Sequence, residues 1–246
     1  MLQQDLLYKI YMSRIEERWL EPLESHAETA VERFVASTRR LAKILNNDGI
    51  PSIPFTEPSV PLFTALSDIE KRHALWRIKF MIELCEKVQG KGDYVNRSAI
   101  TTQAFLEQSG FTSSPDLIEQ LEEDDNVDIF NSSHQLIFAS LRTFGLVSFT
   151  LEQFFSRPWM DLLSRDHYGV HEKLYQLTQD ILAGKHINTV STTFVTDHIC
   201  RELTSLEKRS FIVFPRFFAP VFEGDQVVGY LCTNKIFPYD EPQPTE

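Results

Sequence analysis

The sequence has few cysteines and few glycines. Its three cysteines, Cys85, Cys200 and Cys232, include no pair with C-x-x-C spacing. An odd number of cysteines without such spacing argues against a disulfide framework or a structural zinc site, and it fits a reducing compartment. Glycine occurs only 9 times in 246 residues, whereas phenylalanine occurs 19 times. Many apolar rings and few flexible positions predict a well-filled core.

The sequence also lacks targeting features. Its first residues contain no basic segment followed by an apolar stretch, so we expect no signal peptide. No apolar run approaches the roughly 20 residues that span a bilayer, so we expect no membrane span and a cytoplasmic location. Basic residues are fewer than acidic ones, and the net charge is −11. Because an acidic surface repels phosphate backbones, direct binding to nucleic acid is not expected.

The first half of the sequence has the apolar periodicity of helices. Residues 5–47 predict a long amphipathic helix that is kinked or divided at Pro22. Residues 50–62 contain four prolines and predict an extended connector. Ser67 and Glu70 have the spacing of a capping box at a helix start. Further helices are predicted over residues 67–90, 101–108 and 114–122.

A run of acidic residues divides the sequence. Residues 122–126 read EEDDN and lack the ligand spacing and glycine of a calcium loop, so we expect a solvated linker. This divides the chain into an all-helical domain over 1–124, a second domain over 125–238 and a disordered tail over 239–246.

The second half predicts a different fold class. Its expected order is two strands, short helices, a long helix and three strands. Strands separated by helices and closed by an antiparallel hairpin indicate an α+β domain, here an antiparallel five-stranded sheet with helices on one face. The strands are predicted over 127–130, 135–140, 187–199, 210–222 and 227–236, and the helices over 142–163 and 166–182.

Two stretches carry a resemblance to a known family. Residues 149–166, FTLEQFFSRPWMDLLSRD, and residues 216–230, RFFAPVFEGDQVVGY, resemble the helical stretch and the last hairpin of PAS domains. The resemblance covers about residues 127–237. It departs from the family at Ser148, where PAS domains usually have glycine, and at residues 140–142, where many carry asparagine.

The resemblance implies a regulatory protein that binds and signals. A PAS-like domain would sense a small ligand between its sheet and its helices, or hold a signalling partner. No kinase, cyclase or DNA-binding motif accompanies it, so we expect output through a protein partner or a homodimer. Cavity residues are expected at Trp159, Leu174, Phe211, Val213, Phe217 and Leu231.

Two alternatives remain open. The frequent phenylalanines favour an interior filled by its own side chains, which would make the chain a scaffold or oligomerisation subunit without a ligand. An enzyme with a site at the domain interface would need convergent polar groups that the sequence does not reveal, and no catalytic residue is predicted.

Two histidines on the predicted long helix are candidate cofactor ligands. His167 and His171 are four residues apart and share a helix face. In some PAS proteins a histidine on this helix binds haem, so the resemblance implies His171 or His167 as a haem ligand. The alternative is two partly exposed polar residues, and we expect no cofactor because no third ligand is visible. Cys200 follows the long helix, whereas the flavin-reactive cysteine of light-sensing PAS proteins precedes it, so Cys200 and Cys232 are interpreted as core residues.

The last two predicted strands are apolar on both faces. A strand with one solvated face should alternate apolar with polar residues. We therefore expect the outer face of the sheet to be covered by the N-terminal helices or by a second protomer. The residues expected at such an interface are Phe214, Phe218, Tyr230, Trp19 and Phe34.

Overall fold

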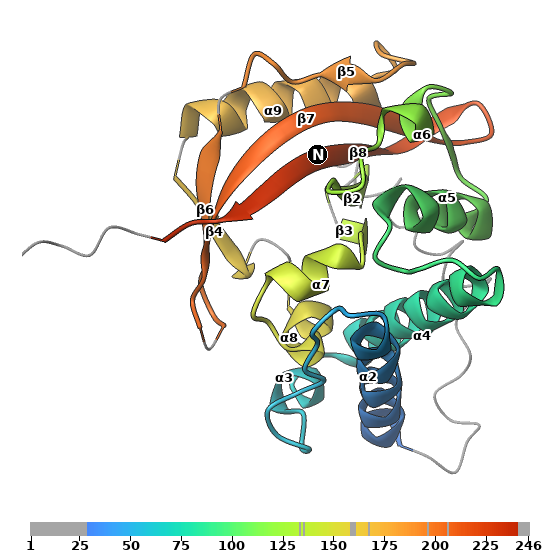
Figure 1. The fold of residues 1–246 in the computed structure, drawn as a ribbon, viewed down its shortest axis with the longest axis vertical. Coiled ribbons are helices and arrows are strands. Elements are labelled where there is room, and N and C mark those ends of the chain that lie inside the picture. Colours follow the sequence, from blue (N-terminus) through green and yellow to red (C-terminus); the bar gives the residue numbers. More distant parts are fainter. Residues whose placement is uncertain are drawn as a thin grey trace, which may run out of the picture.

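A computed structural model describes residues 29–240, except 133, 135, 158–160, 167, 196 and 206 (Figure 1). The predicted kink at Pro22 and residues 241–246 of the predicted tail lie outside the described residues. Side-chain caps mark where several helices begin, and the shortest strands form by pairing with residues that are distant in the sequence.

Two of the N-terminal helices begin at a side-chain cap. Thr29 with Glu32, and Ser67 with Glu70, each form a capping box in which the two residues satisfy each other's backbone N–H. Gly110 ends a helix with a left-handed φ of 73°. These helices are α2 (Ala30–Asn47), α3 (Pro61–Thr64), α4 (Asp68–Gly90), α5 (Ser98–Ser109) and α6 (Leu117–Gln120). The helix predicted over 114–122 is therefore shorter than expected.

The sheet is antiparallel and larger than expected. Within the described residues it has eight strands, not five, in the order β3-β2-β8-β7-β6-β4, with β1 and β5 also paired to β7. The predicted strands correspond to β2 (Asn126–Asn131), β3 (Leu136–Ala139), β6 (His198–Glu202), β7 (Ser210–Glu223) and β8 (Gln226–Pro238). The strand predicted over 187–199 is divided into β5 (Val190–Ser191) and β6. The strands that sequence reasoning missed are short: β1 (Thr112–Ser113) and β4 (Leu163–Arg165).

Three short strands cover one edge of β7 in succession. β6 pairs with residues 210–213, β5 with 217–218 and β1 with 221–222. The other edge of β7 pairs with β8 along nearly its whole length. Since β1 lies in the half that was predicted to be all-helical, the sheet itself crosses the expected domain boundary. The buried side chains of both halves form one core cluster, and a separate helical domain over 1–124 stays a prediction.

A bulge in β7 exchanges the two faces of this strand. The register is Pro215 opposite Asn234 and then Phe217 opposite Thr233, which leaves Arg216 as the extra residue. Because residues directly opposite each other share a face, every side chain after the bulge changes side. We name one side the α9 face. It carries Asp128, Phe130, Cys200, Phe211, Val213, Phe218, Tyr230 and Cys232. The opposite face carries Ile129, Phe138, Phe217 and Leu231.

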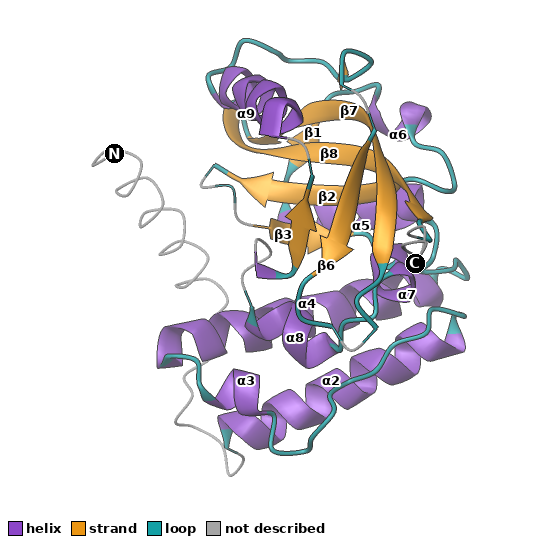
Figure 2. Cartoon of the chain, turned by 90° about the vertical axis from the view of Figure 1, so that its left-hand side faces the viewer, coloured by secondary structure: helices purple, strands orange, loops and turns teal. Residues whose placement is uncertain are grey.

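Helices lie on both sides of the sheet. Helix α9 (Tyr168–Leu182) packs against β8 and β7, while α5 lies against β2 on the other side (Figure 1). A layer of helices lies next to α5 (Figure 2). It contains α2, α3, α4 and α8 (Leu151–Ser156), and α7 (Arg142–Leu146) leads into α8. The Phe105 ring of α5 lies 4.6 Å from that of Phe138 on the opposite face. The expectation that the N-terminal helices cover the outer face is confirmed over this region.

The acidic run over 122–126 is a structural element and not a solvated linker. Asp125 is fully buried and pairs with Arg216, the bulge residue of β7. Glu122 pairs with Arg216 at 2.5 Å and with Lys235 at 2.6 Å. Cations from β7 and β8, about 90 to 110 residues away in sequence, thus neutralise the run. Periodicity could not predict these long-range pairs.

Candidate functional site

The α9 face carries a buried carboxylate. Asp128 lies near the middle of β2, opposite Cys232 of β8, and is 7% exposed. Its Oδ1 has no hydrogen-bond partner among the described residues. Burial raises the pKa of this carboxyl from 3.8 to about 7, while the charge of Arg165 on β4 acts in the opposite direction. A buried carboxylate without a full set of donors costs free energy unless it is protonated or meets a donor.

Two thiols lie on the same face of the sheet, and one of them, Cys232, is opposite this carboxylate. Cys232 is buried, and burial together with the charge of Asp128 raises the pKa of its thiol. Cys200 of β6 is also buried, and burial raises its pKa while Arg165, which hydrogen-bonds it, opposes that rise. Both cysteines are therefore neutral at physiological pH and poor nucleophiles. Their interpretation as core residues is confirmed.

A hydrogen-bonded chain joins the sheet to α9. Nδ1 of His134, in the turn between β2 and β3, lies 2.9 Å from the hydroxyl of Tyr230, and its Nε2 lies 3.0 Å from Nε2 of Gln179 on α9. With the Gln179 amide donating to Nε2, the neutral imidazole donates from Nδ1 to Tyr230. Burial lowers the pKa of His134 and raises that of the Tyr230 hydroxyl. The ring of Tyr175, also on α9, lies 5.4 Å from His134.

The expected cavity residues do not lie together. Phe211 and Val213 are buried on the α9 face, and Leu174 of α9 is partly buried against the core. Phe217 and Leu231 are buried on the opposite face, because the bulge at Arg216 moves Phe217 to the other side. Plain alternation along β7 had placed Phe217 with Val213, and a bulge is not visible in that pattern. Trp159, His167 and the side chain of His171 lie outside what the structure describes.

The expected interface residues are corrected in the same way. Phe218 and Tyr230 are 5% and 6% exposed and lie inside the α9 face. Phe34 is fully buried and stacks on Phe63, with ring centres 3.9 Å apart, in the helical layer. Large rings in such positions serve the core and cannot meet another protein. Only Phe214 is exposed, at 40%, and Trp19 lies outside the described residues.

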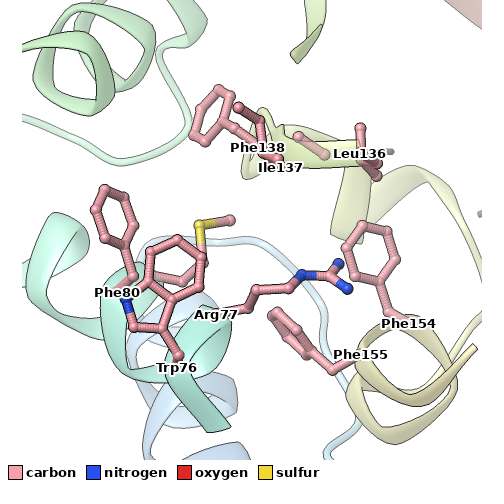
Figure 3. Close-up of a pocket in the computed structure, with 10 residues that line it drawn as sticks. Trp76, Arg77, Phe80, Leu136, Ile137, Phe138, Phe154 and Phe155 are labelled. Atoms are coloured by element: carbon pink, nitrogen blue, oxygen red, sulfur yellow. The ribbon is translucent and has the colours of Figure 1, made fainter. Parts of the chain in front are cut away.

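A second feature is a pocket between α4, β3 and α8. Trp76, Phe80, Phe154 and Phe155 line it with Arg77 (Figure 3). The guanidinium carbon of Arg77 lies 5.2 Å from the centre of the Phe155 ring. Burial lowers the pKa of Arg77 to about 10, which leaves it charged at neutral pH.

Sequence reasoning missed Asp128 and Arg77. The first had a usable signal: strands with both faces covered should be apolar throughout, so a lone aspartate in the apolar run Val127 to Phe130 is an anomaly. Arg77 had none, because an arginine among helical apolar residues is ordinary. The described residues contain no cluster of three or more metal-ligating side chains. No helix among them combines the length and apolarity that crossing a membrane requires.

Comparison with known proteins adds no relative. No protein-family model, no curated protein and no solved structure matches this chain. Any functional conclusion therefore depends on the geometry.

Proposed function

We propose that this chain is a PAS-like regulatory protein that senses a small ligand between the sheet and α9 and signals through an associated protein. The α9 face supports the proposal: a buried carboxylate with an unpartnered oxygen lies on the same face of the sheet as α9, and this helix is hydrogen-bonded to the sheet through His134. A ligand that donates a hydrogen bond to Asp128 would lie close to the chain from Tyr230 to Gln179. Occupancy of this face would thereby alter the packing of α9.

The connectivity of the sheet also supports a PAS-like fold. Two strands, a helical block and three strands lie in one antiparallel sheet, in the order β3-β2-β8-β7-β6. This is the element order of the PAS resemblance. The extra strands β1, β4 and β5 extend the edges of this arrangement and do not interrupt it.

A screen of thermal stability tests the ligand. Wild type and Asp128→Asn would be melted in the presence of small amines, amides and nucleobases, compounds that donate hydrogen bonds. The proposal expects at least one compound to raise the melting temperature of the wild type and to lose that effect in Asp128→Asn. An absorption spectrum of the purified protein separately tests for haem or flavin. A screen in which every compound acts equally on both proteins would contradict a ligand site at Asp128.

An exposed aromatic pair favours association with a protein partner. Phe214 of β7 and Phe237 of β8 are 40% and 46% exposed, and their ring centres lie 5.7 Å apart. Exposed apolar rings side by side are characteristic of contact surfaces. Light scattering at tens of micromolar tests a homodimer, with Phe214→Ser expected to shift the mass towards the monomer. A wild-type monomer at that concentration would contradict a homodimer and leave a different protein as the proposed partner.

A further inference from the structure

Arg77 is a partly buried cation without an acidic partner among the described residues. It projects from α4 into the pocket under β3 and α8 (Figure 3). Its guanidinium stacks on the Phe155 ring. It makes no hydrogen bond or ion pair within the part of the chain that the structure describes. Burial alone lowers its pKa, and no neighbouring carboxylate raises it.

The absence of a partner for Arg77 contrasts with the rest of the protein. The chain has 35 acidic and only 24 basic residues. Arg216, which is also partly buried, pairs with both Glu122 and Asp125. A guanidinium always stays protonated in proteins, so it cannot relieve its desolvation by losing a proton. Removing a charge from water is costly unless an opposite charge replaces the lost hydration. An anion that enters this pocket would supply that charge.

The lining of the pocket indicates which anion fits. Apart from Arg77, the lining residues carry no charge: Trp76, Phe80, Met81, Leu136, Ile137, Phe138, Ala139, Phe154 and Phe155. One guanidinium balances one negative charge, and its planar fork matches a carboxylate with two parallel hydrogen bonds. A phosphate monoester carries about −1.5 to −2 charges at neutral pH and would remain partly uncompensated.

The size of the pocket limits how much of a ligand enters it. The cavity volume of the pocket is about 10 Å³, which is room for one water molecule. A carboxylate group is of that order, whereas a whole drug-sized molecule is far larger. The apolar remainder of the ligand would not fit inside the pocket and would extend out of it, past the aromatic side chains that line it.

We propose that the Arg77 pocket binds the carboxylate of a small monocarboxylic acid with an aromatic or aliphatic body. This site lies between α4, β3 and α8, away from the α9 face, so it does not depend on the function proposed above. Arg77 fixes the carboxylate, and the surrounding rings select an apolar body over a polar one.

Trp76 lines the pocket and reports binding through its fluorescence. The probe is 4-phenylbutyrate, which has a single carboxylate on an apolar body, and its neutral counterpart is 4-phenylbutanol. A ligand of this size is expected to bind with a Kd of about a millimolar. The titration repeated on Trp76→Phe assigns the signal to the pocket.

Variants test the role of Arg77. Arg77→Met should weaken phenylbutyrate binding about tenfold or more, since a charge-assisted pair of hydrogen bonds is lost. Arg77→Lys keeps the charge and should bind with intermediate affinity. The matched control is Arg39→Met, because Arg39 also stacks on a phenylalanine, Phe55, at 5.3 Å but is exposed. Its binding should equal that of the wild type.

Four outcomes would overturn the proposal. They are equal affinity of Arg77→Met and wild type, equal affinity for the acid and the alcohol, tighter binding of phenyl phosphate than of phenylbutyrate, and no saturable binding at all. Melting curves show whether each variant is folded. If Arg77→Met does not fold, Arg77→Lys and the comparison of acid with alcohol decide the question on folded protein.

Discussion

A β-carbon at Gly229 would lie 2.2 Å from the carbonyl oxygen of Phe130 on the neighbouring strand. Non-bonded carbon and oxygen atoms do not approach so closely, and both atoms belong to paired strands in the middle of the sheet. We therefore expect Gly229→Ala to push β2 away from β8 and to lower the free energy of unfolding by about 1–3 kcal/mol. Denaturant unfolding measures this loss.

Gly90→Ala is the matched control for this substitution. Gly90 is the last residue of α4, and a β-carbon there meets no atom within 4 Å. Alanine is the better helix former, so this variant should be as stable as the wild type or slightly more stable. Equal stabilities of the two variants would mean that β2 and β8 yield to the added methyl group without cost.

Local chemistry explains which parts of this fold the sequence predicts. The cap at Ser67 satisfies backbone groups within three residues, so the start of α4 was predicted from the sequence alone. The same pattern at Thr29 and Glu32 marks the start of α2, which the helix predicted over 5–47 did not include. The apolar content of β7 and β8 correctly predicts that both sheet faces are covered over much of these strands, although Phe214 and Phe237 stay exposed. By contrast, β4 and β5 are three and two residues long and form strands only because β6 and β7 offer them a free edge.

The candidate site was less predictable, because it depends on register. The bulge at Arg216 places Phe217 and Phe218 on the faces opposite to those that simple alternation gives them. Arg216 occupies the bulge while it pairs with Asp125, 91 residues earlier in the chain. Sequence periodicity carries no information about such a partner. This is why the two faces of β7 could not be assigned correctly beyond Pro215.

The raised pKa of Asp128 predicts how stability depends on pH. The carboxyl has a pKa of about 7 in the folded state against about 3.8 when solvated. Between these pH values the folded state binds more protons than the unfolded state. The stability that protonated Asp128 contributes is therefore fully present below about pH 3.8 and is lost as pH rises through 7. Asp128→Asn removes this dependence. Relative to wild type, its stability should grow by at most about 1.4 kcal/mol per pH unit across that window.

Unfolding of both proteins in urea from pH 4 to pH 8 measures this difference. Asp124→Asn is the control, because Asp124 is a partly exposed carboxylate whose pKa is lowered by Lys235. Its difference from wild type should be nearly constant across this window, because a lowered pKa changes stability only near and below its ordinary value of 3.8. A constant difference between Asp128→Asn and wild type at every pH would show that Asp128 titrates like a solvated aspartate.

The lowered pKa of His134 predicts an opposite dependence at mildly acidic pH. Its neutral imidazole hydrogen-bonds to Tyr230 and Gln179, and burial disfavours the charged form. The unfolded state therefore binds a proton near pH 6.5 while the folded state does not, so stability is lost as pH falls below about 6.5. His134→Gln should reduce this loss. Working in the Asp128→Asn background removes the opposing titration of the aspartate from the same window.

Amide exchange of α9 checks the structural role of this histidine. If His134 holds α9 on the sheet, exchange in α9 should become faster below pH 6.5, after correction for the intrinsic rates, and α4 should be unaffected. Tyr230→Phe removes the hydroxyl only and should speed exchange in α9 at all pH values. Unchanged exchange in both variants would remove His134 and Tyr230 from the coupling proposed between the ligand and α9.

Glu152 of α8 joins this helix to the start of α3, and its removal should lower stability. It is 2% exposed, and its Oε1 accepts the backbone N–H of Leu62 at 2.8 Å and that of Phe63 at 3.4 Å, at the start of α3. Glu152→Ala leaves two buried donors unsatisfied, so the free energy of unfolding should fall by about 1–3 kcal/mol. Glu152→Gln keeps an acceptor oxygen and should lose less. Glu83→Ala, at an exposed position of α4, should change stability by no more than about 0.5 kcal/mol. Equal losses in the alanine and glutamine variants would assign the effect to the charge of Glu152 and not to its hydrogen bonds.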